Sequence, residues 1–471
     1  MRFAATCQWA IAFLALGILN GCGGGGSGSS SGASSNPPPP TVTLQSIVVT
    51  PGSLTAGVGG GHQLQASGTY SDGTKKDLTA TATWASSSAS VATVTAAGVV
   101  TGMSAGSSTI SASSGGVSGT NTVTILDSTW APAASSPVLL SAKTATLLLD
   151  GTVLADGGDP YQIGAAIYDP VADAWSTTTP PATSRYYATA TLLKDGRVLV
   201  AGGSVLDITA PIGTSRTIIL SSAELFDPKT KTWSAAADMP TPREVHAAVL
   251  LPSGKVLVVG GDDGHNALPD ALLYDPTTNT WTPSTTLVTP GSSSTATVLT
   301  SGKVLVTTSA GLSSSPGFSE VYDPASDTWS NGPNMNTVHL NGATATLLND
   351  GRVLLVGGET NPSSGPMATP EVYDPVAGTW TLTTGMTNGR IGHTATLLPS
   401  GKVLVVGGLN ITLADFATTE LFDPATNTWS LGASMSGPRE LHGAVLLQSG
   451  AVFVTGGAHQ GAALQTSELY W

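Results

Sequence analysis

One short phrase recurs along most of this chain with a fixed spacing. Tyr or Phe is followed by Asp-Pro and, seven residues after the aromatic, by Trp; the complete copies span 168–175, 226–233, 274–281, 322–329, 373–380 and 422–429. Another copy breaks off at Tyr470-Trp471, and upstream of the copies lie glycine-bounded apolar runs such as 196–203. Units of about 50 residues with such elements are typical of repeat architectures rather than of separate globular domains.

The apolar runs predict sheets that are buried on both faces. Val256–Val259 is continuously apolar, as expected for a blade packed between two neighbours. These motifs resemble kelch repeats over residues 127–471, and the resemblance implies a β-propeller. Second-strand runs begin at seven positions: 153, 198, 256, 304, 353, 403 and 452. We therefore expect an all-β chain with a seven-bladed kelch propeller, in which the unmatched strand at Trp130 completes the last blade.

Residues 41–126 predict a separate β unit. Strand-like runs alternate with Gly, Ser and Asp turns, and the motifs Val48–Pro51, Tyr70–Gly73 and Thr83-Trp84 resemble the group 2 bacterial immunoglobulin-like domain. The resemblance implies a small β-sandwich with Trp84 in its core, used as a spacer or an adhesive unit.

The N-terminus indicates export and anchoring. Residues 1–21 read as a signal peptide, since the apolar run Trp9–Leu19 is too short for a permanent membrane span. The run ends in Leu19-Asn20-Gly21-Cys22, which resembles a bacterial lipobox and implies lipidation of Cys22. Residues 22–40 are a Gly/Ser/Pro-rich tether. We expect a lipid-anchored protein of the cell envelope, at the outer membrane or cell surface; an ordinary signal peptide is the alternative.

Charge and cysteine content restrict the partners. The formal net charge is −13 and no basic run occurs, which argues against nucleic acid. The two cysteines, Cys7 and Cys22, both precede the folded regions, so no disulfide can form within them. The expected membrane contact is the anchor alone, and we expect a monomer.

A recurring Arg-x-x-His pattern gives the candidate binding residues. It occurs before the first strand of several repeats, as Arg243/His246, Arg390/His393 and Arg439/His442, and Arg185 stands at the same place without a His. Equivalent repeat positions lie around one axis, so these groups are expected to ring one end of the central channel. A positive ring would favour an anionic ligand, binding more tightly below about pH 6.5. The alternative is that each Arg and His bonds the backbone of the neighbouring blade.

Two other patterns give weaker indications of a metal site or an enzyme. Asp262-Asp263-Gly264-His265 could bind a cation, but a solvated loop is the better interpretation, and no metal or cofactor site is predicted. Galactose oxidase also carries a kelch propeller, yet its crosslinked Tyr-Cys radical needs a Cys that this repeat region lacks. Tyr186 and Tyr187 are therefore interpreted as packing or carbohydrate-stacking groups.

The sequence predicts a surface binding or adhesion protein whose propeller recognises a protein or glycan. The alternative is a carbohydrate-active enzyme, an epimerase or an oxidase-like protein, that uses the same mouth. A six-bladed kelch family epimerises sialic acid; seven copies argue against it, but Glu244 and Glu440 beside two of the arginines leave an enzyme possible.

Overall fold

The computed structural model describes residues 41–140, 144–157, 163–207, 217–287, 291, 294–308, 317–339, 342–359, 367–410, 412 and 414–471. All regular elements in these residues are β-strands. Residues 44–471 cluster as one compact unit, apart from residues 1–43. The predicted signal peptide, tether and lipidated Cys22 lie outside the described residues. In the described part of the chain, no helix is long and apolar enough to cross a membrane.

The N-terminal β unit contains three sheets. Given in order of pairing, their strands are β1 (Leu44–Thr50), β4 (Gln65–Tyr70) and β5 (Lys75–Asp77); β2 (Ser53–Gly57), β10 (Val117–Leu126), β9 (Gly106–Ser114) and β6 (Thr83–Ser86); and β3 (Gly61–Gln63), β8 (Val99–Gly102) and β7 (Ala92–Val94). Alternate residues of β9 and β10 are buried, which is the pattern of a sheet with one face on a core. Trp84 packs against that core while partly buried, and its Nε1 donates to Thr79 O at 2.9 Å.

The repeat region contains seven four-stranded antiparallel sheets within the described residues, numbered here as blades 1 to 7. The strands of each blade are given from the innermost outward. Blade 1 contains β12 (Thr144–Leu147), β13 (Val153–Asp156), β14 (Ala165–Asp169) and β15 (Ala174–Thr177), and blade 2 contains β16 (Thr189–Leu192), β17 (Val198–Ala201), β20 (Ala223–Asp227) and β21 (Thr232–Ala235). Blade 3 contains β22 (Ala247–Leu250), β23 (Val256–Val259), β24 (Ala271–Asp275) and β25 (Thr280–Pro283), and blade 4 contains β26 (Ser294–Val298), β27 (Val304–Thr308), β28 (Phe318–Asp323) and β29 (Thr328–Asn331).

Blades 5 to 7 continue the pattern, and two short ribbons project from the loops. Blade 5 contains β30 (Thr344–Leu347), β31 (Val353–Val356), β32 (Glu371–Asp374) and β33 (Thr379–Leu382). Blade 6 contains β34 (Thr394–Leu397), β35 (Val403–Val406), β36 (Thr419–Asp423) and β37 (Thr428–Leu431). Blade 7 contains β38 (Gly443–Leu446), β39 (Val452–Thr455), β42 (Ser467–Tyr470) and β11 (Trp130–Ala133). The ribbons are β18 (Ser204–Leu206) with β19 (Thr217–Ile219), and β40 (Ala458–His459) with β41 (Ala462–Ala463).

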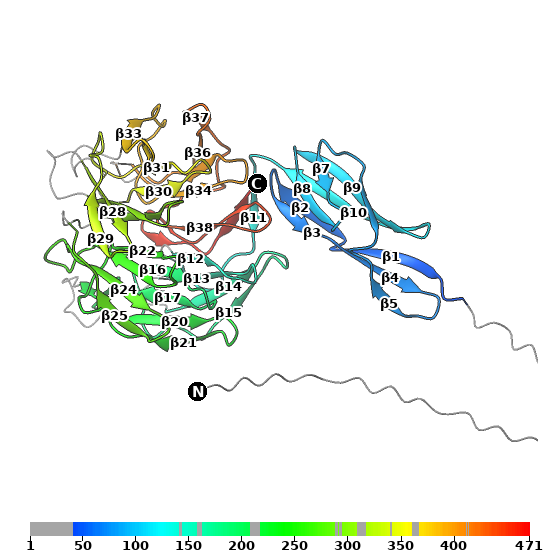
Figure 1. Ribbon diagram of the computed structural model, residues 1–471, viewed down its shortest axis with the longest axis horizontal. Helices are drawn as coiled ribbons and strands as arrows, with labels where there is room; N and C mark the ends of the chain where they lie inside the picture. Colours follow the sequence, from blue (N-terminus) through cyan, green and yellow to red (C-terminus); the bar gives the residue numbers. More distant parts are fainter. Residues whose placement is uncertain are drawn as a thin grey trace, which may run out of the picture. The chain divides into compact units, whose positions relative to one another are not determined.

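The innermost strands contact one another in a closed ring, with β38 against β12. In Figure 1 strands β12, β16, β22, β30, β34 and β38 lie toward the middle, and β15, β21, β25, β29, β33 and β37 lie at the rim. The last blade takes its outer strand from the start of the array, since Trp130 pairs with Tyr470. This pairing confirms the predicted partner of Trp130 and removes an open edge from the sheet.

The Tyr/Phe–Trp phrase is explained by the hairpin of the two outer strands. In blade 3, Tyr274 and Trp281 are cross-strand partners with ring centroids 4.9 Å apart. Asp275 Oδ1 accepts a hydrogen bond from Thr277 N at 3.0 Å and begins the turn, in which Asn279 has a left-handed φ of 54°. Trp281 Nε1 donates to Ala237 O at 2.8 Å, a residue of the preceding blade's exit loop. The phrase is therefore a structural element that joins neighbouring blades.

Candidate functional site

The predicted arginines lie inside the blades. Arg390 has an exposed fraction of 0%, its Nη1 donates to Gly407 O at 2.8 Å, and its Nη2 donates to Glu420 Oε1 at 2.7 Å. The other oxygen of Glu420 accepts a hydrogen bond from Thr387 N at 2.7 Å. One ion pair therefore holds together the loop before strand β34, the end of β35 and the start of β36.

The other three predicted arginines repeat this arrangement. Each donates to the carbonyl of the glycine that follows the second strand, and each pairs with a carboxylate before or within the third strand. The ion pairs are Arg185–Glu224 at 3.0 Å, Arg243–Asp270 at 2.7 Å and Arg439–Glu468 at 2.8 Å. The three arginines are 6%, 0% and 1% exposed. The arginines therefore do not form the predicted positive ring, because carboxylates neutralise them; Glu224, Glu420 and Glu468 are buried, and Asp270 is partly exposed.

The predicted histidines are also buried, and each reaches the preceding blade. His246 Nε2 and Thr189 Oγ1 form a hydrogen bond of 2.9 Å; the corresponding pairs are His393 with Thr344 at 2.9 Å and His442 with Thr394 at 2.8 Å. Burial, followed by the charge of Arg243, lowers the pKa of His246 to about 3. His246 is therefore neutral at pH 6.5, and the predicted gain of charge below that pH is wrong for this residue.

Two blades show how the buried pair varies. In blade 5 His339 replaces the arginine: its Nδ1 lies 2.6 Å from Gly357 O, and its Nε2 lies 3.4 Å from Glu371 Oε1. Burial would raise the pKa of Glu371, but hydrogen bonds from His339, Thr337 and Asn336 outweigh it and lower the pKa to about 2. In blade 1 the equivalent positions are Leu140 and Ala166, which are both buried and apolar.

The residue after each arginine belongs to a bridged turn that the Arg-x-x-His pattern did not predict. Tyr186, Glu244, Ile391 and Glu440 each form an isolated antiparallel bridge with the loop after the second strand of the same blade. The next residue has a left-handed backbone: φ is 52° at Tyr187, 53° at Val245, 65° at Gly392 and 52° at Leu441. Left-handed backbone is unfavourable for residues other than glycine, above all for β-branched Val245, and such strain concentrates at functional sites.

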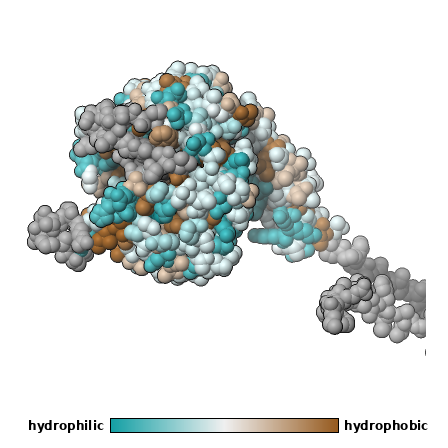
Figure 2. All heavy atoms as spheres, turned by 60° about the vertical axis from the view of Figure 1, so that its left-hand side comes forward, coloured by the Kyte–Doolittle hydropathy of each residue, from teal (hydrophilic) through white to brown (hydrophobic). Residues whose placement is uncertain are grey.

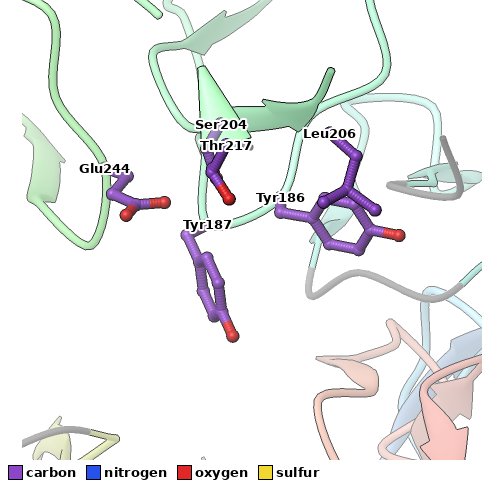
Figure 3. A pocket seen from close by; sticks show the side chains of 6 residues that line it. All are labelled: Tyr186, Tyr187, Ser204, Leu206, Thr217 and Glu244. Carbon is purple, nitrogen blue, oxygen red and sulfur yellow. The ribbon is translucent and has the colours of Figure 1, made fainter. Parts of the chain in front are cut away.

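A pocket opens beside two of these turns. It has a volume of about 260 Å³ and is lined by Tyr186, Tyr187, Ser204, Leu206, Thr217 and Glu244. In Figure 3 Ser204 and Thr217 lie above Tyr187 on the β18–β19 ribbon, the Glu244 carboxylate lies to the left, and the Tyr187 ring extends downward into open space. The lining therefore combines aromatic surface with hydroxyl and carboxylate groups, which is typical of a small-molecule pocket.

Negative charge dominates around Tyr187. Its side chain is 42% exposed, and its pKa is raised first by burial and then by the charges of Glu244 and Glu440. The two glutamates come from blades 3 and 7, so acidic groups of two different blades contribute to raising this pKa. The visible face in Figure 2 is mixed in hydropathy, with apolar side chains scattered over it in small areas.

The acidic loop after blade 3's second strand uses its carboxylates for turns. Asp262 Oδ1 accepts from Gly264 N at 2.6 Å, and Asp263 Oδ1 accepts from His265 N at 2.8 Å and Asn266 N at 2.7 Å. Within the described ranges, no group of three or more His, Cys, Asp or Glu side chains could hold a metal ion. These bonds account for the acidic run as a structured turn.

Comparisons with known proteins identify both regions. Residues 43–125 match the family model of the bacterial Ig-like domain (group 2), and residues 185–240 and 245–287 match the kelch motif. The chain carries a bacterial immunoglobulin-like domain followed by kelch repeats. A stretch of 99 residues, 21% of the chain, is 48% identical to "Ice-binding protein 1" of Shewanella frigidimarina, and the match spans 11% of that protein.

A solved structure supports the kelch-type propeller fold. A fungal alcohol oxidase of the AA5 family, in complex with copper, matches with a TM-score of 0.58 and 20% identity, covering 73% of this chain and 76% of that one. Its copper does not suit the residues present here. The repeat region contains no Cys for a crosslink, and the described side chains include no metal-binding group of three or more.

The sequence contained signals both for the carboxylate partners of the arginines and for the residues of the pocket. Glu224, Glu420 and Glu468 stand two residues before the aromatic of their blades, where blade 1 has Ala166, so the arginine partners could have been found by comparing repeats. Tyr186 and Tyr187, which the sequence marks as packing or carbohydrate-stacking candidates, both line the pocket. Ser204, Leu206 and Thr217 were missed, although the longest connection between second and third strands of a repeat begins there.

Proposed function

We propose that this protein is a surface binding module whose kelch propeller recognises a glycan through the pocket at Tyr187. The observation that carries the proposal is the pocket of about 260 Å³ in which two tyrosines lie beside Ser204, Thr217 and Glu244. A tyrosine face stacks on the apolar face of a sugar ring, and hydroxyl and carboxylate groups bond its hydroxyls. The volume lies near the lower end of small-molecule sites, roughly 300–1,000 Å³, and suits one terminal sugar rather than a protein surface.

The backbone around the pocket supports a binding role. Tyr187 is held at a φ of 52° by bonds on both sides: Tyr186 exchanges backbone hydrogen bonds of 2.8 Å with Ser204, and Val245 N donates to Tyr187 O at 3.3 Å. A strained residue held in this way is preorganised, which reduces the entropy lost when a ligand binds.

The cell-envelope location belongs to the same proposal. The lipobox-like sequence before Cys22, followed by the tether, supports lipid anchoring, and the likeness to Ice-binding protein 1 supports a role at the cell surface. Ice is not proposed as the ligand, since the match spans only 11% of that protein. Mass spectrometry of the N-terminal peptide is expected to show a lipidated Cys22; an unmodified Cys22 would contradict anchoring.

The test is a glycan panel with the full-length protein and its Tyr187→Ala variant. Loss of a stacking aromatic should weaken binding of a glycan by at least about tenfold, equivalent to about 1.4 kcal/mol. Val171→Ala is the control, because Val171 is 90% exposed on an outer turn and does not line the pocket. Tyr187→Phe should retain most of the affinity if stacking is the main contact. Glycan binding that Tyr187→Ala leaves unchanged would place the site elsewhere.

A further inference from the structure

The cations nearest the pocket are already neutralised. Arg185 directly precedes Tyr186, yet its Nη2 donates to Glu224 Oε1 at 3.0 Å and to Ser222 Oγ at 2.9 Å. Its Nη1 donates to the carbonyls of Gly202 at 2.9 Å and Ser222 at 2.8 Å. Its Nε also donates to Glu224 Oε1 at 3.4 Å, so this guanidinium, in a residue that is 6% exposed, has no donor left for a ligand carboxylate.

The negative charge of the lining is not neutralised in this way. None of the pocket-lining residues carries a positive charge, and Glu244 is the one that carries a negative charge. Glu244 and Asp262 exchange both backbone hydrogen bonds, each at 3.0 Å, so their side chains project to the same side of the bridge. Asp262 Oδ1 accepts a hydrogen bond from Gly264 N at 2.6 Å, whereas Glu244 lines the pocket and is the carboxylate with which a cation there could pair.

The aromatic surface suits the same charge. A tyrosine ring attracts a cation that lies over its face, and the attraction is stronger when the cation is desolvated. In Figure 3 the ring of Tyr187 and the carboxylate of Glu244 face the same open space. The charges of Glu244 and Glu440 both act on the Tyr187 phenol, so the potential there is negative from two blades.

We propose that the pocket selects an amine-bearing sugar, whose ammonium group lies between the Tyr187 ring and the Glu244 carboxylate. This inference rests on the proposed glycan binding and specifies its ligand class. It reverses the anionic ligand expected from the arginine pattern. Uronic and sialic acids meet Glu244 with a like charge and are disfavoured. Neutral sugars keep the stacking contact but lose the charge-assisted hydrogen bond, a loss that typically weakens binding at least about tenfold.

The experiment compares two oligosaccharides with the same backbone, one bearing free amines and the other bearing neutral acetamido groups. Isothermal titration of the full-length protein uses a β-1,4-linked glucosamine tetramer and its fully N-acetylated counterpart at about pH 6. At least about tenfold tighter binding of the amine form is expected, with an affinity that falls as salt is added. Glu244→Gln should remove this preference, leaving the acetylated form within about twofold. Asp238→Asn is the matched control, since Asp238 is exposed and lies outside the pocket lining.

The outcomes separate this inference from the proposed function. If Tyr187→Ala abolishes binding of both tetramers while Glu244→Gln changes neither, glycan binding stands and the amine selectivity is overturned. Equal affinity for the two tetramers, or binding of neither, also overturns it. If Tyr187→Ala changes neither affinity, the pocket is not the glycan site and both proposals fail. If Glu244→Gln does not fold, the salt dependence of the wild type decides, because only the amine form should lose affinity.

Discussion

Blades 1 and 6 share one backbone hydrogen bond but differ in the side chains at that position. In both, the carbonyl four residues before the innermost strand accepts a hydrogen bond from a glycine of the preceding blade: Leu140 O from Gly457 N at 2.7 Å, and Arg390 O from Gly358 N at 3.2 Å. Blade 6 has the buried Arg390–Glu420 ion pair at these positions, and blade 1 has the buried apolar residues Leu140 and Ala166. Blade 1 lacks both members of the pair, so neither charge is buried there without its partner, which would be strongly destabilising.

The largest expected loss of stability comes from replacing the ion pair of blade 6 with the residues of blade 1. Arg390→Leu alone leaves Glu420 buried at 1% exposure without its cation and should cost about 3–5 kcal/mol. The double variant Arg390→Leu/Glu420→Ala should recover most of that loss, since the apolar pair of blade 1 is then recreated. Melting temperatures of the single and double variants form the double-mutant cycle.

The cycle also tests the structural role of the arginines. Additive losses would show that the two residues do not act as a pair. If the Arg390→Leu protein melts like the wild type, the buried ion pair is not structural, and an exposed ligand-binding arginine becomes the better interpretation.

How much of this the sequence could predict follows from what the repeats encode. The Tyr–Trp spacing and the apolar runs fix strand order and pairing, so the partner of Trp130 was predictable as Tyr470. The same register placed the arginines near the axis but could not say whether each side chain turns into the blade or the channel. That direction depends on the carboxylate partner, which lies 30 residues from Arg390 in the sequence but 2.7 Å away in space. The pocket needed the folded β18–β19 ribbon.

A half-buried aspartate in blade 1, Asp156, gives the prediction of intermediate size. Asp156 ends strand β13 at the position of Val406 in blade 6, and its Oδ1 is buried with no hydrogen-bond partner among the described residues. Burial raises the pKa of Asp156 to about 7, although the charge of Arg185 opposes this shift. Between about pH 3.8 and pH 7, Asp156 therefore keeps its proton in the folded protein and loses it in the unfolded chain.

Asp156→Asn should stabilise the protein, and more so as pH rises. A raised folded-state pKa means that the stabilisation is complete below about pH 3.8 and is lost as pH rises through about 7. The amide has no such loss, so its advantage at pH 8 should be about 1–3 kcal/mol and should shrink toward pH 5. Exposed Asp238→Asn is the control. An advantage that stays constant between pH 5 and pH 8 would show that Asp156 does not titrate with folding.

The smallest expected effect compares the strained turns of blades 3 and 6. Val245 has a φ of 53°, and Gly392 has 65° at the equivalent position of blade 6. Because a β-branched residue is unfavourable in this region and asparagine tolerates it, Val245→Asn should stabilise by about 1 kcal/mol. Gly392→Val, which introduces the same strain into blade 6, should lower the free energy of unfolding by about 1 kcal/mol and so lower the melting temperature. The Val245 side chain does not line the pocket, so glycan affinity should stay within about twofold in Val245→Asn. Reduced affinity with unchanged stability would instead show that the strained turn of blade 3 positions Glu244 for the ligand.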